Sequence, residues 1–388
     1  MIVLITIHGI GFEQAPTEPA TFDGFADALH DGLRSSLAGV LGDDPVRVAA
    51  GGRGPVYAQS NFPPHTGGTE AGVSRLGTWT GAGSVDIAGK PLAANGAGIA
   101  HVALVYSGLE EQTGDVPALL GMEVIGAASI ASYATLGGLV QMAFRDLEAL
   151  RHHPSVSRDT SSSLQPRTDT AMHRGIIARL MHKQPAPGGP APDAASHSIL
   201  RVVEDDVAAY VTRNEHRERV RAFLRDATSR ILARPDVDGV VINGHSNGTV
   251  MGYDLIAALS PPSARRVRAL VTSGSPLRKY VDLLDWGRDA GNMRLMTGPW
   301  TNFWDIADPV ADPLAPPIDW KRGDPDAGGP GMFVVYDPDT GAQAARPVTD
   351  VLVNNVTDST GTGLRAHNYW DNPAFCAQAA EILRQASS

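Results

Sequence analysis

The amino-acid sequence predicts an α/β fold, in which a doubly wound and mostly parallel sheet carries a helical cap or lid insertion. Two observations favour this class. Short apolar, β-branched runs alternate along the chain with longer segments of helical periodicity, as in a parallel sheet with crossover helices. The 388 residues also exceed one average domain but suit a single α/β core with an insertion. No repeat of solenoid length interrupts the alternation.

The N-terminal part begins with a strand. The run Ile2–Ile7 is apolar and β-branched and is followed by Gly9 and Gly11, which is typical of a central strand in a parallel sheet. The glycine-rich stretch 51–98 lacks clear periodicity, so we interpret it as loops with one hairpin. The other elements expected in this part are a helix at 22–37, a short strand at 46–49 and a strand at 101–106.

The middle of the chain is mostly apolar over 119–150, and 124–144 is an uncharged run of 21 residues, long enough to span a membrane. Because this run consists largely of Gly, Ala, Ser and Thr, it favours a buried helical hairpin or a lid helix, with membrane contact as the alternative. The low-complexity stretch 154–197 is interpreted as a mobile loop or excursion. The chain therefore divides into an N-terminal core part, an insertion and a C-terminal core part, at 1–118, 119–198 and 199–388.

The C-terminal part returns to alternating strands and helices. We expect a hairpin around 337–341 and a closing helix at 373–385. The remaining predicted helices share helical periodicity and cover 200–210, 216–232 and 248–259. The remaining predicted strands are short apolar runs at 237–243, 267–272, 302–304 and 351–354.

Charge and cysteine content exclude some classes of protein. The 32 basic and 42 acidic residues give a net charge of −10, which repels phosphate backbones at long range, so no nucleic-acid partner is expected. A single cysteine, Cys376, excludes an intrachain disulfide and is expected to be a small buried or half-buried hydrophobic residue. No basic leader or small-residue cleavage site precedes the first strand, so we expect no signal peptide and a cytoplasmic location.

One short motif carries chemistry. Residues 240–248 read VVINGHSNG, where a strand runs into Gly-x-Ser-x-Gly and a helix follows. In this pattern the serine occupies a strained turn, and Gly244 and Gly248 leave the space that the turn needs. The helix that follows directs its N-terminus at Ser246, so the amide of Asn247 can stabilise an oxyanion. The motif predicts Ser246 as a nucleophile, and an ordinary strand-to-helix turn is the alternative.

A second turn follows the first strand. Residues 8–11 read HGIG, and a backbone amide there would lie over the carboxyl edge of the sheet. We expect Ile10 to supply the second oxyanion donor, with Gly11 as the alternative. His8 is interpreted as a structural residue that holds this loop.

A serine hydroxyl needs a base, and the base needs an acid to orient it. Among the twelve histidines, His367 is selected because it follows the last predicted strand in a loop just before the closing helix. For the acid, Asp308 is preferred because it lies in a turn a few residues past a strand. Asp305 and Asp312 stay open as alternatives, and each of the three could instead be a turn aspartate that binds its own backbone.

The order Ser246, Asp308, His367, preceded by the N-terminal His-Gly, resembles the α/β-hydrolase superfamily of esterases and lipases. Residues 272–276, which read TSGSP, are similar to the Gly-Ser-Pro of lipase-like members. The resemblance implies an eight-stranded type of sheet with the acid after the strand that follows Gly-Ser-Pro, which matches Asp308.

The resemblance also implies an activity. It points to a carboxylesterase or lipase that acts on a small-molecule or lipid-like ester through an acyl-enzyme, with no cofactor and no metal. An acyltransferase or an amidase could use the same triad. A non-catalytic binding protein on the same fold is the alternative from another class, since a fold does not determine function.

Overall fold

The computed structural model describes residues 1–9, 24–59, 75–79, 84–86, 91–94, 97–106, 214–278, 291–305, 308, 310–315, 333–336, 343–358 and 367–388. The predicted insertion at 119–198, the predicted helix at 200–210, and Ile10 and Gly11 lie outside these ranges. Among the helices that are described, none combines the length and the apolar content needed to cross a membrane.

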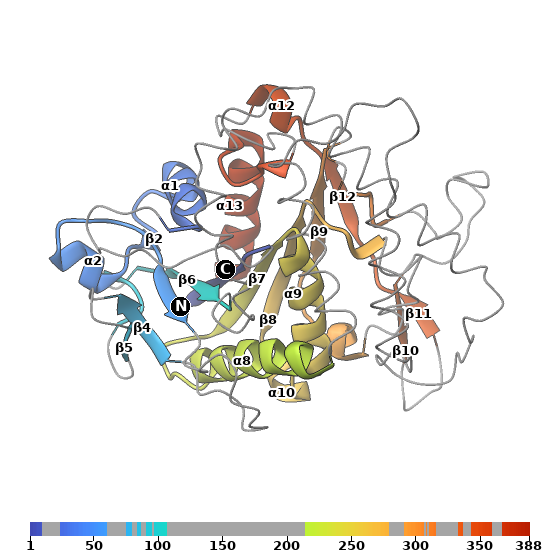
Figure 1. Cartoon of the computed structure of the whole chain (residues 1–388), viewed down its shortest axis with the longest axis horizontal. Coiled ribbons are helices and arrows are strands. Elements are labelled where there is room, and N and C mark those ends of the chain that lie inside the picture. Colours follow the sequence, from blue (N-terminus) through green and yellow to red (C-terminus); the bar gives the residue numbers. More distant parts are fainter. Residues whose placement is uncertain are drawn as a thin grey trace, which may run out of the picture.

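A mostly parallel sheet of ten strands forms the centre of the molecule (Figure 1). Strand β1 (Ile2–Ile7) lies in its middle, parallel to β6 (Ile99–Val105) on one side and to β7 (Gly239–His245) on the other. Beyond β7 the sheet continues with three parallel strands, in the order β8 (Val267–Ser273), β9 (Trp300–Trp304) and β12 (Thr349–Leu352).

The other half of the sheet mixes parallel and antiparallel pairs. Strand β6 pairs in parallel with β2 (Leu41–Gly42) and with β3 (Val56–Gln59). The glycine-rich stretch supplies β4 (Arg75–Trp79) and β5 (Ser84–Asp86), which pair antiparallel and extend the sheet beyond β3. A separate antiparallel ribbon corresponds to the predicted hairpin and consists of β10 (Val334–Tyr336) and β11 (Gln343–Ala345).

Helices cover both faces of the sheet (Figure 1). Helices α1 (Asp27–Ser36) and α13 (Pro373–Ser387) pack side by side on one face. Helices α8 (Asn214–Leu232) and α9 (Asn247–Ala258) pack on the other face. This arrangement confirms the predicted α/β class.

Alternation along the strands explains how one sheet serves two cores. In β1, Val3 and Ile5 belong to the core under α8 and α9, whereas Ile2 and Leu4 belong to the core under α1 and α13. Successive side chains of a strand point to opposite faces, so an uninterrupted apolar run is what a strand covered on both faces requires. The lone Cys376 of α13 is buried, as predicted.

The expected strand at 46–49 is wrong, because these residues lie in helix α2 (Pro45–Ala49). Asp44 caps this helix by accepting a hydrogen bond from the Val46 amide at 2.8 Å, and Pro45 occupies the first turn, where its fixed φ suits a helix. The capping pair therefore outweighs the β-branched residues. Three further short helices are found that were not expected, namely α10 (Pro261–Ala264), the 3-10 helix η3 (Gly291–Leu295) and α12 (Asn355–Asp358).

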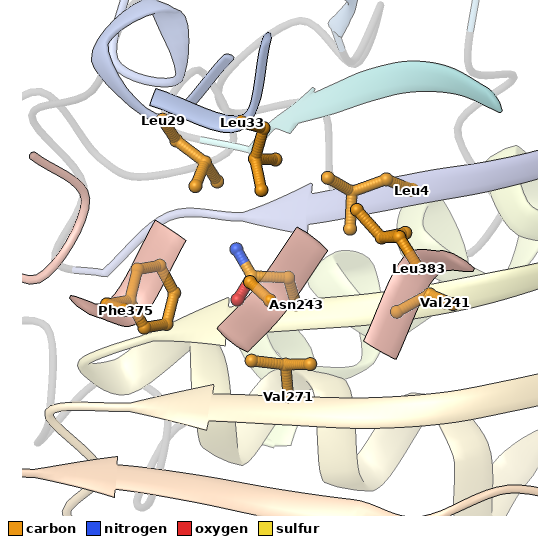
Figure 2. A pocket seen from close by; sticks show the side chains of 9 residues that line it. Leu4, Leu29, Leu33, Val241, Asn243, Val271, Phe375 and Leu383 are labelled. Atoms are coloured by element: carbon orange, nitrogen blue, oxygen red, sulfur yellow. The ribbon is translucent and has the colours of Figure 1, made fainter. Parts of the chain in front are cut away.

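A small cavity lies between the sheet and the α1–α13 layer (Figure 2). Its lining is apolar except for Asn243 and consists of Leu4, Leu29, Leu33, Val241, Asn243, Val271, Phe375, Ala379 and Leu383. These side chains belong to the core beneath two helices, so we interpret the cavity as incomplete packing.

Candidate active site

The candidate site lies where β1 and β7 end side by side. In the parallel register Ile7 pairs with Gly244, so His8 and Ser246 follow at the same edge of the sheet. The strands on the β6 side of β1 come before those on the β7 side in the sequence, so the strand order reverses at β1. The carboxyl edge of β1 and β7 is therefore a topological switch point. Ligands of open α/β sheets bind at the carboxyl edge of the strands at such a point.

Ser246 has a strained backbone. Its φ of 55° and ψ of −129° make it the one non-glycine residue with a positive φ in the described part of the chain. Such a conformation costs on the order of 1–3 kcal/mol and persists only where the surroundings enforce it. Here the Ser246 amide donates to the carbonyl of Ser273 at 2.9 Å, and the Thr249 hydroxyl donates to the carbonyl of Ser246 at 2.7 Å.

Glycines let the end of β1 approach this turn. A Cβ at Gly248 would lie 2.2 Å from the carbonyl oxygen of His8, and one at Gly244 would lie 2.6 Å from the carbonyl oxygen of Gly248. A Cβ at Gly9 would lie 2.7 Å from the Cβ of Ser246. The turn after β1 therefore packs directly on the serine, and only glycine fits at these positions.

Asn247 follows Ser246 and opens α9. Its amide therefore lies at the positive end of the helix dipole, which suits a negative charge that develops beside Ser246. Of the two expected oxyanion donors, Asn247 has this placement, whereas Ile10 lies outside the described residues.

His367 and Asp308 form a hydrogen-bonded pair. The distance from His367 Nδ1 to Asp308 Oδ2 is 2.8 Å. Asp308 also accepts from the hydroxyl of Tyr369 at 2.8 Å and from the amide of Val310 at 2.9 Å. A proton on Nδ1 satisfies this bond, and it leaves Nε2 able to accept a proton.

The neighbours of Asp308 decide its charge. Burial alone would raise the pKa of this carboxyl, but the charge and hydrogen bond of His367, with the Val310 amide and the Tyr369 hydroxyl, outweigh burial and lower the pKa. Asp308 is therefore ionised at neutral pH. The pKa of Tyr369 is raised well above its usual value by burial and by the negative charge of Asp308, so its hydroxyl stays protonated and donates.

The other two candidate acids have different partners. Asp305 Oδ2 accepts from the amide of Asn355 at 2.7 Å, at the start of α12. The Asp312 amide donates to the carbonyl of Ser275 at 3.3 Å. The structure therefore brings the carboxylate of Asp308 to His367 and that of Asp305 to the amide of Asn355.

Residues 273 and 274 link the Ser246 turn to His367. Gly274, which has a φ of 61°, packs against the imidazole, and a Cβ there would lie 2.7 Å from His367 Cε1. The preceding residue, Ser273, accepts the hydrogen bond from the Ser246 amide. In the described part of the chain no hydrogen bond joins Ser246 Oγ to His367, and in unliganded sites such bonds often tighten only when substrate binds.

His8 has a structural environment. Its ring stacks on Tyr106 with centroids 3.9 Å apart, its Nδ1 lies 3.1 Å from the carbonyl oxygen of Gly9, and its Nε2 accepts from the Tyr106 amide at 3.2 Å. Burial, with a smaller effect of His245, lowers the pKa of His8 to about 3. Both ring nitrogens are thus used to hold the end of β1, in agreement with the structural interpretation of this residue.

Sequence reasoning missed three neighbours of the base: His245, Gly274 and Tyr369. His245 and Gly274 lie within motifs that were recognised, and Tyr369 follows His367 by two residues, but nothing in those patterns indicates contact with the imidazole. As for a metal, no cluster of three His, Cys, Asp or Glu side chains suited to an ion occurs among the described residues.

Comparison of the chain with models of known protein families, with curated proteins and with solved structures finds no match. Function is therefore inferred from the geometry of this site.

Proposed function

We propose that this chain is a serine hydrolase of the α/β-hydrolase type that cleaves carboxylic esters, with Ser246 as nucleophile, His367 as base and Asp308 as orienting acid. One observation carries the proposal: a serine with a positive φ between a strand and a helix shares a sheet edge with a hydrogen-bonded His–Asp pair. Backbone strain of this kind concentrates at functional sites. We assign the cap or lid of this fold to 119–198.

The proposed cycle has two halves. Nε2 of His367 takes the proton of Ser246 as the hydroxyl attacks the ester carbonyl, and ionised Asp308 stabilises the imidazolium. The amides of Asn247 and Ile10 hold the oxyanion. The alcohol then leaves with the proton from His367, and a water activated by the same histidine hydrolyses the acyl-enzyme.

Each step uses only groups of the chain, the ester and water, so this cycle requires no cofactor or metal. The substrate class is a small-molecule or lipid-like ester. An acyltransferase would differ in its acyl acceptor, because an alcohol would then replace water in the second half of the cycle.

A nitrophenyl ester series combined with a fluorophosphonate probe tests the proposal. Wild type should turn over at least one ester and carry the probe on Ser246, as located by mass spectrometry of peptides. Ser246→Ala should lose at least about 10³-fold in turnover and all labelling, because it keeps only substrate binding and the oxyanion donors.

Ser35→Ala serves as the matched control, because Ser35 is an exposed serine of α1 far along the chain from the site motifs. It should match wild type in both turnover and labelling. Labelling at another residue, or full turnover by a folded Ser246→Ala protein, would contradict the assignment of the nucleophile.

A further inference from the structure

We propose that His245, the residue between Gly244 and Ser246 in the motif, is a positioning residue that ties the base to the nucleophile turn. It does so by donating a hydrogen bond from its Nε2 to the backbone carbonyl of His367. This inference rests on the proposed function and gives a role to a residue that is not the nucleophile, the base or the acid.

This hydrogen bond joins two distant parts of the chain. His245 Nε2 lies 2.8 Å from the carbonyl oxygen of His367, across 122 positions of sequence. Asp308 holds the imidazole of His367 at Nδ1, and His245 holds the backbone of the same residue. A ring held only at Nδ1 can still pivot about that bond, whereas the second bond fixes the main chain from which the ring projects.

His245 is itself held firmly. It is the last residue of β7, and its Cα pairs with Ser273 of β8 in the sheet register. Its ring lies against three aromatic rings, with centroid distances of 4.6 Å to His367, 4.9 Å to Trp370 and 6.0 Å to Tyr369. Because His245 directly precedes Ser246, one rigid segment carries the nucleophile and anchors the base.

The charge state of His245 suits this role. Burial lowers the pKa of His245 to about 3, and the charge of His367 acts in the same direction, against smaller opposite effects of the bond to the His367 carbonyl and of Asp308. The side chain is therefore neutral at working pH, with its proton on Nε2. A cationic side chain at this distance would oppose the imidazolium that forms on His367 during the reaction.

Two substitutions separate positioning from packing. His245→Phe keeps an aromatic ring but removes the donor. His245→Gln replaces the ring but keeps an N–H donor at about the same reach. Both are measured against wild type by kcat and KM for the best nitrophenyl ester, by the rate of fluorophosphonate labelling, and by the folded fraction from circular dichroism at the assay temperature.

We expect His245→Phe to lose roughly 10- to 100-fold in kcat and in labelling rate, with little change in KM, because a small misplacement of a catalytic group has an effect of this size. His245→Gln should recover much of the loss. Unchanged kcat in folded His245→Phe, or a loss no greater than its loss of folded protein, would overturn the role of His245. Equal losses in both variants would do so too, because the donor would then not matter.

The wild-type control distinguishes the two proposals. If wild type shows no labelling at Ser246 and no turnover, the proposed function fails, and this inference fails with it. If wild type is active and labelled while His245→Phe matches it, the inference about His245 alone is wrong.

Discussion

Two aspartates three positions apart show how neighbours decide the role of a side chain. Asp305 and Asp308 are both buried, and the hydroxyl of Tyr369 lies between them, accepting from the Asp305 amide and donating to the Asp308 carboxylate. Only the partners differ: the carboxylate of Asp305 holds the amide of Asn355, and that of Asp308 holds the imidazole of His367.

Exchange of each aspartate for asparagine should separate these roles. Asp308→Asn should lower kcat by about 10⁴-fold, because an amide favours the wrong tautomer of His367 and does not stabilise the imidazolium. Asp305→Asn should keep kcat within about tenfold, since its amide oxygen can still accept from Asn355. Steady-state ester hydrolysis with matched thermal melts measures both, and equal losses in the two variants would remove Asp308 from the triad.

At the scale of elements, the layer formed by α1 and α13 supports the strands that carry the site. The two helices cover Leu4 of β1 and Val241 of β7, and the cavity of Figure 2 lies between them and these strands. This layer packs against the sheet without using any residue of the triad. Changes there should therefore act on stability and leave the chemistry of Ser246 in place.

Leu383→Ala tests this separation. Leu383 is buried on α13 and lines the cavity, so truncation enlarges a gap that already exists and should lower the free energy of unfolding by about 2–5 kcal/mol. Gln378→Ala, on the exposed side of the same helix, should change it by no more than about 0.5 kcal/mol. Urea unfolding measures both, and fluorophosphonate labelling of the folded variants should match wild type. Loss of labelling in folded Leu383→Ala would show that this layer shapes the site.

At the scale of the whole molecule, three buried histidines are neutral in the folded state. Burial lowers the pKa of His8 and of His245 to about 3, and it lowers the pKa of His101 well below the usual value, with His30 acting in the same direction. Below pH 6.5 these histidines become protonated in the unfolded chain but stay unprotonated in the folded chain. The folded state therefore loses stability as the pH falls from about 6.5 toward the folded pKa values.

We predict that the free energy of unfolding is constant between pH 7 and about pH 8 and falls as the pH decreases from 6 to 4. Each of the three histidines contributes a slope of up to about 1.4 kcal/mol per pH unit. Burial raises the pKa of Asp44 to about 6, and this carboxyl opposes the loss by up to about one proton in the same range. The lowered pKa of Asp308 adds a loss at still lower pH, where that carboxylate becomes protonated. Urea unfolding at a series of pH values measures the slope. His101→Gln should reduce it by up to about 1.4 kcal/mol per pH unit, which is the contribution of one proton. A flat profile from pH 7 to pH 4 would contradict this prediction.

Much of the fold could be predicted locally. The strand at Ile2–Ile7, the strand–turn–helix around Ser246 and the closing helix at Pro373–Ser387 all follow from periodicity, glycine and capping, which act within a few residues. The helix that replaces the expected strand at 46–49 also has a local cause, since Asp44 and Pro45 form a helix start signal. The motif at 244–248 predicts Ser246, and the places of Asp308 and His367 after later strands predict the acid and the base.

What only the tertiary structure decided is which of these groups meet. Chain order does not determine that β1 lies between β6 and β7, because strand pairing depends on contacts across about a hundred residues or more. Nor does it show that Asp308 rather than Asp305 reaches His367, or that His245 binds the backbone of the base, since these bonds span 59 and 122 positions. Local patterns determine the elements of this protein, whereas contacts between distant segments determine its candidate active site, because a hydrogen bond depends on distance in space and not along the chain.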